Sequence, residues 1–136
     1  MATFNDFDSF IEALCEKVHN LGSDTLTLFL TNTAPSAANT QLSNITQITY
    51  TNLSARTLTV NSSGQTSGSY ALSIADKVLT ASGGSVGPFR YVGIYNDTAT
   101  NDELISWWDY GSSITLLDGE SLTVDFPTNV LTGSVS

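Results

Sequence analysis

The sequence predicts a mainly β protein, an antiparallel β-sandwich of jelly-roll-like form with one N-terminal α-helix. Two patterns predict this fold. One apolar stripe with helical spacing occupies the start of the chain, and many short segments of alternating residues follow it, separated by turn sequences. The length of 136 residues fits a single domain, 1–136, with the helix at about 6–20 and the sandwich at about 24–135.

The helix is predicted from apolar residues that recur at steps of three and four, which places them on one face. Asn5 is the expected N-cap, and Gly22 the expected stop. Cys15 borders the stripe, and we expect it to be a packed thiol. The stripe consists of Phe7, Phe10, Ile11, Leu14, Val18 and Leu21.

After Gly22 the period changes from 3.6 to 2. Residues 25–32 alternate leucine with threonine, which predicts a half-buried strand, and Phe29 is the exception on the threonine face. Residues 34–44 are expected to form a loop, and 61–68, 82–88 and 96–102 to form turns. The pair Asp118–Gly119 is typical of a type I′ hairpin turn. Further strands are expected at 45–50, 56–60, 69–75, 77–81, 89–95, 103–110, 113–117 and 121–126, with 131–136 either a last strand or a loose tail.

Composition narrows the possible functions. Thirteen acidic residues face four basic ones, for a net charge of −9. Four scattered bases cannot form the cluster that binds phosphate backbones, so neither nucleic acid nor an anionic membrane is an expected partner. The start of the chain lacks the pattern of a signal peptide, and the one cysteine permits no internal disulfide, so we expect synthesis in a cytosol.

No enzyme, cofactor or metal site is predicted. His19 is the only histidine, one helical turn after Cys15, but nothing around the pair resembles a nucleophile motif. Asp109, next to three aromatic residues, could imitate a sugar-cleaving acid, although an outward-facing aspartate at a strand end is the preferred interpretation. The acidic loop 96–103 is interpreted as a solvated hairpin tip, and calcium binding there is left open.

Large apolar residues occur on both faces of two predicted strands. If alternation is uninterrupted from Leu104, that residue shares a face with Ser106 and Trp108, while Trp107 lies on the other face. In 89–95, the aromatic residues oppose Arg90, Val92 and Ile94. Aromatic residues and arginine are enriched at protein interfaces, although the helix could also cover some of them. The candidate contact residues are Phe4, Phe7, Phe29, Arg90, Trp107, Trp108 and Tyr110.

The two tryptophans are expected to have different roles, with one in the core and the other at or near a subunit contact. The N-terminal segment, where Phe4, Phe7 and Phe10 are crowded together, is the second candidate contact, as an arm that docks on a neighbouring copy.

Three segments carry a resemblance: "DTLTLFLTNTAP" at 24–35, "SGGSVGPFRYVGIYNDTATNDELI" at 82–105 and "WWDYGSSITLLDGESLTVDF" at 107–126. In their order and their amino-acid residues they resemble a family of small structural proteins of tailed-bacteriophage virions, and the similarity extends over nearly the whole chain. No catalytic motif supports the resemblance, and it assigns no role to any single residue.

The resemblance implies a place in the virion, after synthesis in the cytoplasm of the host bacterium. Within that family we expect a capsid decoration, or cement, protein that binds the outer surface of the assembled head and stabilises it. Its expected partners are the major capsid protein and copies of itself, as a homotrimer. The alternative is a tail-associated component or a receptor- or glycan-binding module of the tail, in which Trp107, Trp108 and Tyr110 would stack against sugar rings.

Overall fold

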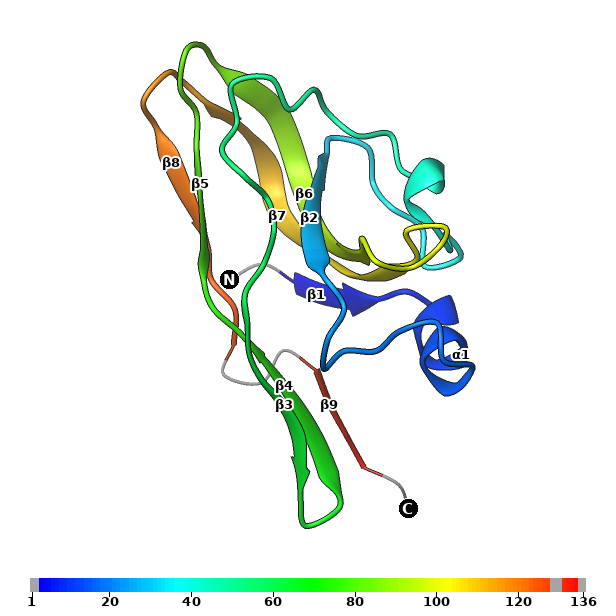
Figure 1. The fold of residues 1–136 in the computed structure, drawn as a ribbon. Helices are drawn as coiled ribbons and strands as arrows, with labels where there is room; N and C mark the ends of the chain where they lie inside the picture. Colours follow the sequence, from blue (N-terminus) through cyan, green and yellow to red (C-terminus); the bar gives the residue numbers. More distant parts are fainter. Residues whose placement is uncertain (1–2, 128–130, 135–136) are drawn as a thin grey trace.

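The computed structural model describes residues 3–127 and 131–134, and within them it confirms a mainly β fold with antiparallel sheets and one α-helix (Figure 1). The elements are β1 (Thr3–Asp6), α1 (Ser9–Cys15), β2 (Leu26–Thr31), a 3₁₀ helix (Leu42–Asn44), β3 (Val60–Thr66), β4 (Ser69–Ile74), β5 (Lys77–Thr80), β6 (Val86–Asn96), β7 (Leu104–Leu116), β8 (Ser121–Val124) and β9 (Leu131–Ser134). No described helix is both long enough and apolar enough to cross a membrane.

Three sheets form the framework. The central sheet has the order β1-β7-β6-β2, and two smaller sheets have the orders β3-β4-β9 and β5-β8. All strand pairs are antiparallel. The long strands β6 and β7 pair in the middle of the central sheet, where Val92 lies opposite Trp108 and Gly93 opposite Trp107.

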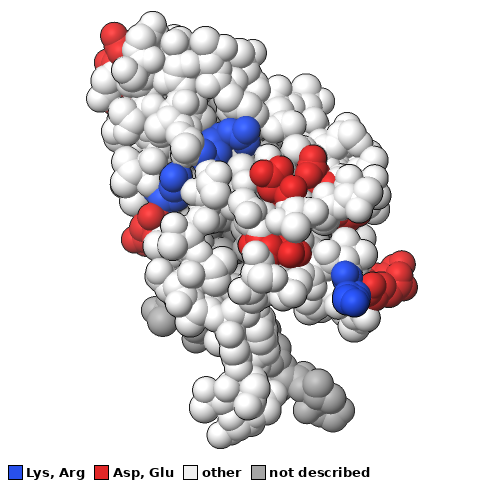
Figure 2. All heavy atoms as spheres, in the orientation of Figure 1, with Lys and Arg blue, Asp and Glu red and all other residues white. Residues whose placement is uncertain are grey.

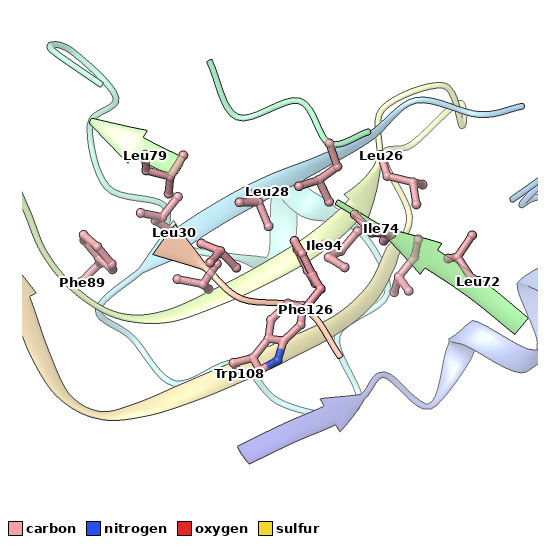
Figure 3. Packing of buried hydrophobic residues seen from close by; sticks show 14 of the residues in the cluster. Leu26, Leu28, Leu30, Leu72, Ile74, Leu79, Phe89, Ile94, Trp108 and Phe126 are labelled. Atoms are coloured by element: carbon pink, nitrogen blue, oxygen red, sulfur yellow. The ribbon is translucent and has the colours of Figure 1, made fainter. Parts of the chain in front are cut away.

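The main core lies between the central sheet and the two smaller sheets. Side chains from β2, β6 and β7 meet Leu72 and Ile74 of β4 and Leu79 of β5 (Figure 3). Leucines at alternate positions of β2 point into this core, as the sequence pattern predicts. The two layers therefore pack one face of the central sheet against the inner residues of the smaller sheets, which is the arrangement of a sandwich.

The opposite face of the central sheet is covered as well, by a second core. Phe29 of β2, Tyr95 of β6 and Leu104 of β7 pack there against Phe7 and Ile45, which come from the N-terminal segment and the long loop after β2. All six residues of β2 are consequently buried. The prediction of a half-buried β2 is wrong, because the chain folds its own loop over the threonine face.

The outer edge of β2 is also closed by the chain itself. The amides of Leu28 and Leu58 form hydrogen bonds with the carbonyl oxygens of Arg56 and Leu26, at 3.0 and 2.9 Å. The amide of Leu30 donates to the phenol oxygen of Tyr50 at 3.0 Å, and the guanidinium of Arg56 lies 3.6 Å from the centre of that ring. Residues 45–50 are therefore not the predicted strand but part of a cover over this edge.

A β-bulge in β7 changes which residues share a face. Ile94 and Tyr95 of β6 lie opposite Ser106 and Leu104, so Ile105 is an extra residue between them. Ile105 joins the main core, and Leu104 lies in the second core. The uninterrupted alternation expected from Leu104 is therefore wrong. Similar register shifts on both sides of Phe89 place its side chain in the main core with Val92, on the opposite face from its predicted one.

The helix is shorter than predicted, at Ser9–Cys15 rather than 6–20. Its N-cap is Asp8, because residues 3–6 are used as strand β1 beside β7. The helix ends where Lys17 takes a left-handed backbone conformation (φ 68°) and the amide of Val18 bonds the carbonyl oxygen of Ala13 at 2.8 Å. These are the features of a Schellman stop. Ile11, predicted in the apolar stripe, is 63% exposed.

Two predicted turns have different outcomes. Residues 61–68 were expected to form a turn, but most of them belong to β3, and the turn is confined to Ser67 and Gly68. A turn is present at Asp118–Gly119, where the amide of Glu120 donates to the carbonyl oxygen of Leu117 at 2.9 Å, but it is not the predicted type I′ turn, because Gly119 has a positive φ (87°) and Asp118 does not. The strands that flank it do not form a hairpin, because β8 pairs with β5 while β7 stays in the central sheet, where 103–110 and 113–117 merge into one strand.

The backbone of Gly93 touches the ring of Phe29 in the second core. A Cβ atom on Gly93 would lie 2.1 Å from Cζ of Phe29 and 2.7 Å from the carbonyl oxygen of Ser106. Gly64, also within a strand, has open space around the corresponding position, with nothing within 4 Å.

We expect Gly93→Ala to lower the free energy of unfolding by about 3 kcal/mol, because the added methyl group must displace a buried ring. Gly64→Ala is the matched control and is expected to raise the free energy of unfolding slightly, by about 0.5 kcal/mol, because alanine loses less backbone entropy on folding. Urea unfolding followed by circular dichroism measures both values. Equal stabilities for the two variants would contradict the packing described for Phe29.

Candidate functional site

Three of the predicted contact residues lie inside the protein's own cores. Phe7 and Phe29 are buried in the second core and Trp108 in the main core. The reason is the cover over the second face of the central sheet, which the sequence pattern left open to solvent. For Phe4, the backbone lies in β1 opposite Trp108, so residues 3–6 form part of the chain's own sheet; the side chain of Phe4 is outside the described part of the structure.

The tandem tryptophans divide as predicted in one respect. Trp108 is a core residue, 6% exposed, with its ring 5.4 Å from that of Phe126 in an edge-on arrangement. Trp107 is on the other face, half-buried, with its ring 4.5 Å from that of Phe7. Trp107 therefore seals the rim of the second core and keeps part of its indole at the surface. A subunit contact at Trp107 stays a prediction.

Beyond Trp107, the same face of the central sheet becomes polar. Arg90 donates two hydrogen bonds to the carboxylate of Asp109, at 2.7 and 3.0 Å, and lies 5.4 Å from the ring centre of Tyr91. These hydrogen bonds, with one from the amide of Gly111, lower the pKa of Asp109, which is therefore a paired anion rather than a proton donor. We call Arg90, Tyr91, Trp107 and Asp109 the Arg90 surface. Tyr110, by contrast, packs against the main core.

The acidic loop 96–103 is ordered by its first residue. The side-chain oxygen of Asn96 accepts the amides of Thr98 and Ala99, at 3.0 and 3.2 Å, and the side-chain carboxylate of Glu103 accepts from Asn101. Within residues 3–127 and 131–134, no three His, Cys, Asp or Glu side chains gather closely enough to hold a metal ion.

A cleft of about 910 Å³ opens between the end of α1, the β3–β4 hairpin and this loop. Sequence reasoning missed it, because its walls come from three segments that are distant in the chain. Cys15 lines it and is exposed, so the prediction of a packed thiol is wrong. Its polar lining consists of Lys17, His19, Asn20, Asp24, Ser63, Tyr70, Thr98, Thr100, Asn101 and Glu103.

The histidine of this cleft is held in one protonation state. Because the oxygen of Asn96 accepts two amides, its NH₂ group must donate, to Asp24 at 2.7 Å and to Nδ1 of His19 at 3.0 Å. Nδ1 is therefore unprotonated, and the neutral ring carries its proton on Nε2. His19 is 4% exposed and Nε2 has no partner in the described structure. Burial lowers the pKa of His19, while the charges of Glu103 and Asp24 act in the opposite direction.

The third surface feature is an arm, which we define as β3, β4 and β9. In Figure 1 it projects beyond the rest of the molecule, and the face drawn in Figure 2 shows neither acidic nor basic residues on it. Every residue of β3 except Val60 is exposed. The signal in the sequence is a run without charge from Thr57 to Ala75, in a chain that is otherwise strongly acidic. Its serines and glycines were interpreted as a turn.

Comparison with protein-family models, with curated proteins and with solved structures finds no match to this chain. The function proposed below therefore rests on the residues and surfaces of the chain and on the resemblance noted in its sequence.

Because burial lowers the pKa of His19, the free energy of unfolding should depend on pH. Below the ordinary histidine pKa of 6.5, the unfolded chain binds a proton that the folded chain resists. The free energy of unfolding should therefore fall as the pH decreases from 7.5 to 5.5. The fall should be at most about 1.4 kcal/mol for each pH unit below the ordinary histidine pKa of 6.5.

Urea unfolding at both pH values tests this expectation, with His19→Gln as the control that cannot titrate. Carboxylates that begin to titrate in this range are present in both proteins, so the difference between them isolates His19. The same pH dependence in the two proteins would contradict a neutral, buried His19.

Proposed function

We propose that this protein is a structural component of a phage virion, a capsid decoration protein that binds the outside of the assembled head and stabilises it. Its partners in this proposal are the major capsid protein and copies of itself, arranged as trimers. The resemblance of segments 24–35, 82–105 and 107–126 to small virion proteins supports the proposal. So does a chain that offers several separate surfaces for contacts with protein.

The arm is the observation that carries this proposal. An isolated sheet of two or three strands is only marginally stable in water unless one face packs on a core. The outer part of β3 has no core beneath it, and its residues are exposed on both faces. Such an extension adds nothing to the packing of the single chain, whereas it can add area to a contact with another subunit.

The Arg90 surface provides a second contact region. Trp107 offers part of an indole ring beside the paired charges of Arg90 and Asp109, a combination that is enriched at the centres of protein interfaces. Contacts of modest area are sufficient on a shell, because each is repeated by symmetry and neighbouring contacts raise the effective concentration of the others. Two separate surfaces are what a protein needs if it is to bind both a shell and its neighbours.

Binding to capsids tests the proposal. Purified protein should co-sediment with undecorated heads of the major capsid protein encoded nearest to it, and should raise the temperature at which these heads break. Trp107→Ala should weaken this binding by roughly tenfold or more, because a central interface aromatic contributes on the order of 2 kcal/mol.

Val78→Ser is the control for this experiment, since Val78 is an exposed apolar residue on β5, outside the Arg90 surface. Heads that bind no protein and gain no heat resistance would contradict the decoration role. Equal weakening by Val78→Ser would show that the contact lies elsewhere than the Arg90 surface.

The cleft around His19 favours a second candidate, a glycan- or receptor-binding module of the phage tail. The cleft combines carboxylates and amides with the ring of Tyr70, whose hydroxyl lies 2.8 Å from that of Ser63. These are groups that bind sugar hydroxyls and stack on sugar rings. The platform predicted from Trp107, Trp108 and Tyr110 is not formed, because Trp108 is buried in the main core.

Adding host polysaccharide distinguishes the two candidates. A glycan in the cleft should shift the NMR signals of the His19 ring and of Tyr70, and Tyr70→Ala should reduce the affinity by roughly tenfold, the loss expected for one stacked aromatic ring. A decoration protein should show no such shift. Signals that change only at Trp107 would place a glycan on the Arg90 surface and contradict binding in the cleft.

A further inference from the structure

The outer edge of β3 is open, in contrast to the edge of β2. Loop residues cover β2 with backbone hydrogen bonds, such as that from Ile48 to Leu30 at 3.0 Å. On the arm, β3 is the first strand in the order β3-β4-β9, and no other described segment pairs with it. Open edges are usually protected by lysine, proline or a bulge. Here the irregularity lies at the base, between Val60 and Ser62, and the pairing from Ser62 to Thr66 is regular.

The hairpin turn determines which backbone groups of β3 point outward. Ser67 and Gly68 have φ of 52° and 82°, as in a two-residue type I′ turn. The pair that flanks such a turn, here Thr66 and Ser69, exchanges both of its hydrogen bonds, and bonded and non-bonded pairs then alternate along the ladder. The N–H and C=O groups of Gln65 and Ser63 therefore face away from β4. They are the groups that an added strand would bind.

Between these two residues lies Gly64, a glycine that nothing within the chain explains. Gly93, the other strand glycine compared above, is required because the ring of Phe29 occupies the place of a side chain. At Gly64, no described atom lies within 4 Å of the position that a Cβ atom would take, and the backbone does not have a positive φ. Glycine within a strand weakens it, and often marks a position where another backbone approaches closely. Apart from its partner strand β4, no described segment of the chain pairs with β3 at Gly64, so the approaching backbone in our proposal comes from another molecule.

The absence of charge around β3 indicates that this other molecule is a second copy of the chain. Close to a two-fold axis, residues of a strand lie near their own copies, so a charge there would meet its like and destabilise the pair. The chain carries a net charge of −9, yet no charged residue occurs from Thr57 to Ala75. The β3 edge is therefore a part of this acidic protein that a second copy can approach without repulsion between neighbouring charges.

We propose that β3 pairs with β3 of a second copy of this chain, antiparallel, about a two-fold axis beside Gly64. Ser63 of one copy then exchanges backbone hydrogen bonds with Gln65 of the other, and the two Gly64 residues form the close, non-bonded pair between them. This inference deepens the proposed contact between copies and rests on it. On a shell, the pairing joins copies that belong to neighbouring trimers, because such trimers are related by two-fold axes.

Disulfide trapping tests the pairing. In a Cys15→Ser background, Gly64→Cys places two thiols across the close pair, where the Cα atoms of about 4.5 Å separation suit a disulfide. Ser62→Cys, on the same face of the same strand, is the matched control, because its two copies would lie four residues apart along the ladder. Under mild oxidation Gly64→Cys should form linked dimers roughly tenfold faster than Ser62→Cys, since the pairing raises the effective concentration of only one thiol pair.

A second readout uses the unaltered protein, so that the test does not depend on how the variants fold. Raising the protein concentration should slow hydrogen exchange of the Ser63 and Gln65 amides severalfold, while the amides that already bond β4 change little. Equal cross-linking of the two variants, or exchange that is independent of concentration, overturns the proposal. If either result is found together with normal binding to capsids, the pairing is wrong and the decoration function is still supported. If the copies pair but do not bind capsids, the decoration function is wrong and the pairing is still supported.

Discussion

The contact between the ring of Phe29 and the bare backbone of Gly93 is the interaction on which the rest of the structure depends. It lets an aromatic side chain lie flat on the second face of the central sheet, where Phe7, Tyr95 and Trp107 close around it. That face is thereby used within the chain. With the edge of β2 also covered, the Arg90 surface is the polar region that remains on this face of the central sheet, and the outer part of β3 is left exposed.

The sequence was sufficient to predict the parts of the fold that local pattern governs. Alternation along β2 predicted that Leu26, Leu28 and Leu30 enter one core, and turn residues predicted the break at Asp118–Gly119. The sequence did not predict the parts of the fold that long-range contacts determine. A bulge such as that at Ile105 leaves no mark in the local pattern, because Leu104 and Ile105 are both apolar and either of them could face a given core. Likewise, the sequence of 45–50 suits a strand, and only the position of Tyr50 over β2 explains why it became a cover instead.

The candidate sites were harder to predict than the fold. Aromatic residues on both faces of a strand were interpreted as exposed contacts, but the same pattern is produced by a sheet with two buried faces. Trp107 was the useful exception, because its neighbour Trp108 could not share its face. Two walls of the cleft around His19 are joined by Asn96, whose side-chain amide connects its own loop to His19 and Asp24. The uncharged run from Thr57 to Ala75, by contrast, is visible in the sequence. The sequence does not show that β3 and β4, which lie in this run, project from the rest of the molecule (Figure 1).

The covered edge of β2 has a consequence for how large an assembly can grow. A sheet with two accessible edges can take up new molecules at both, and ribbons of indefinite length follow, as in fibrils. Here the loop that carries Tyr50 and Arg56 closes one such growth point within the monomer itself. The central sheet therefore cannot extend from one molecule to the next through the edge of β2.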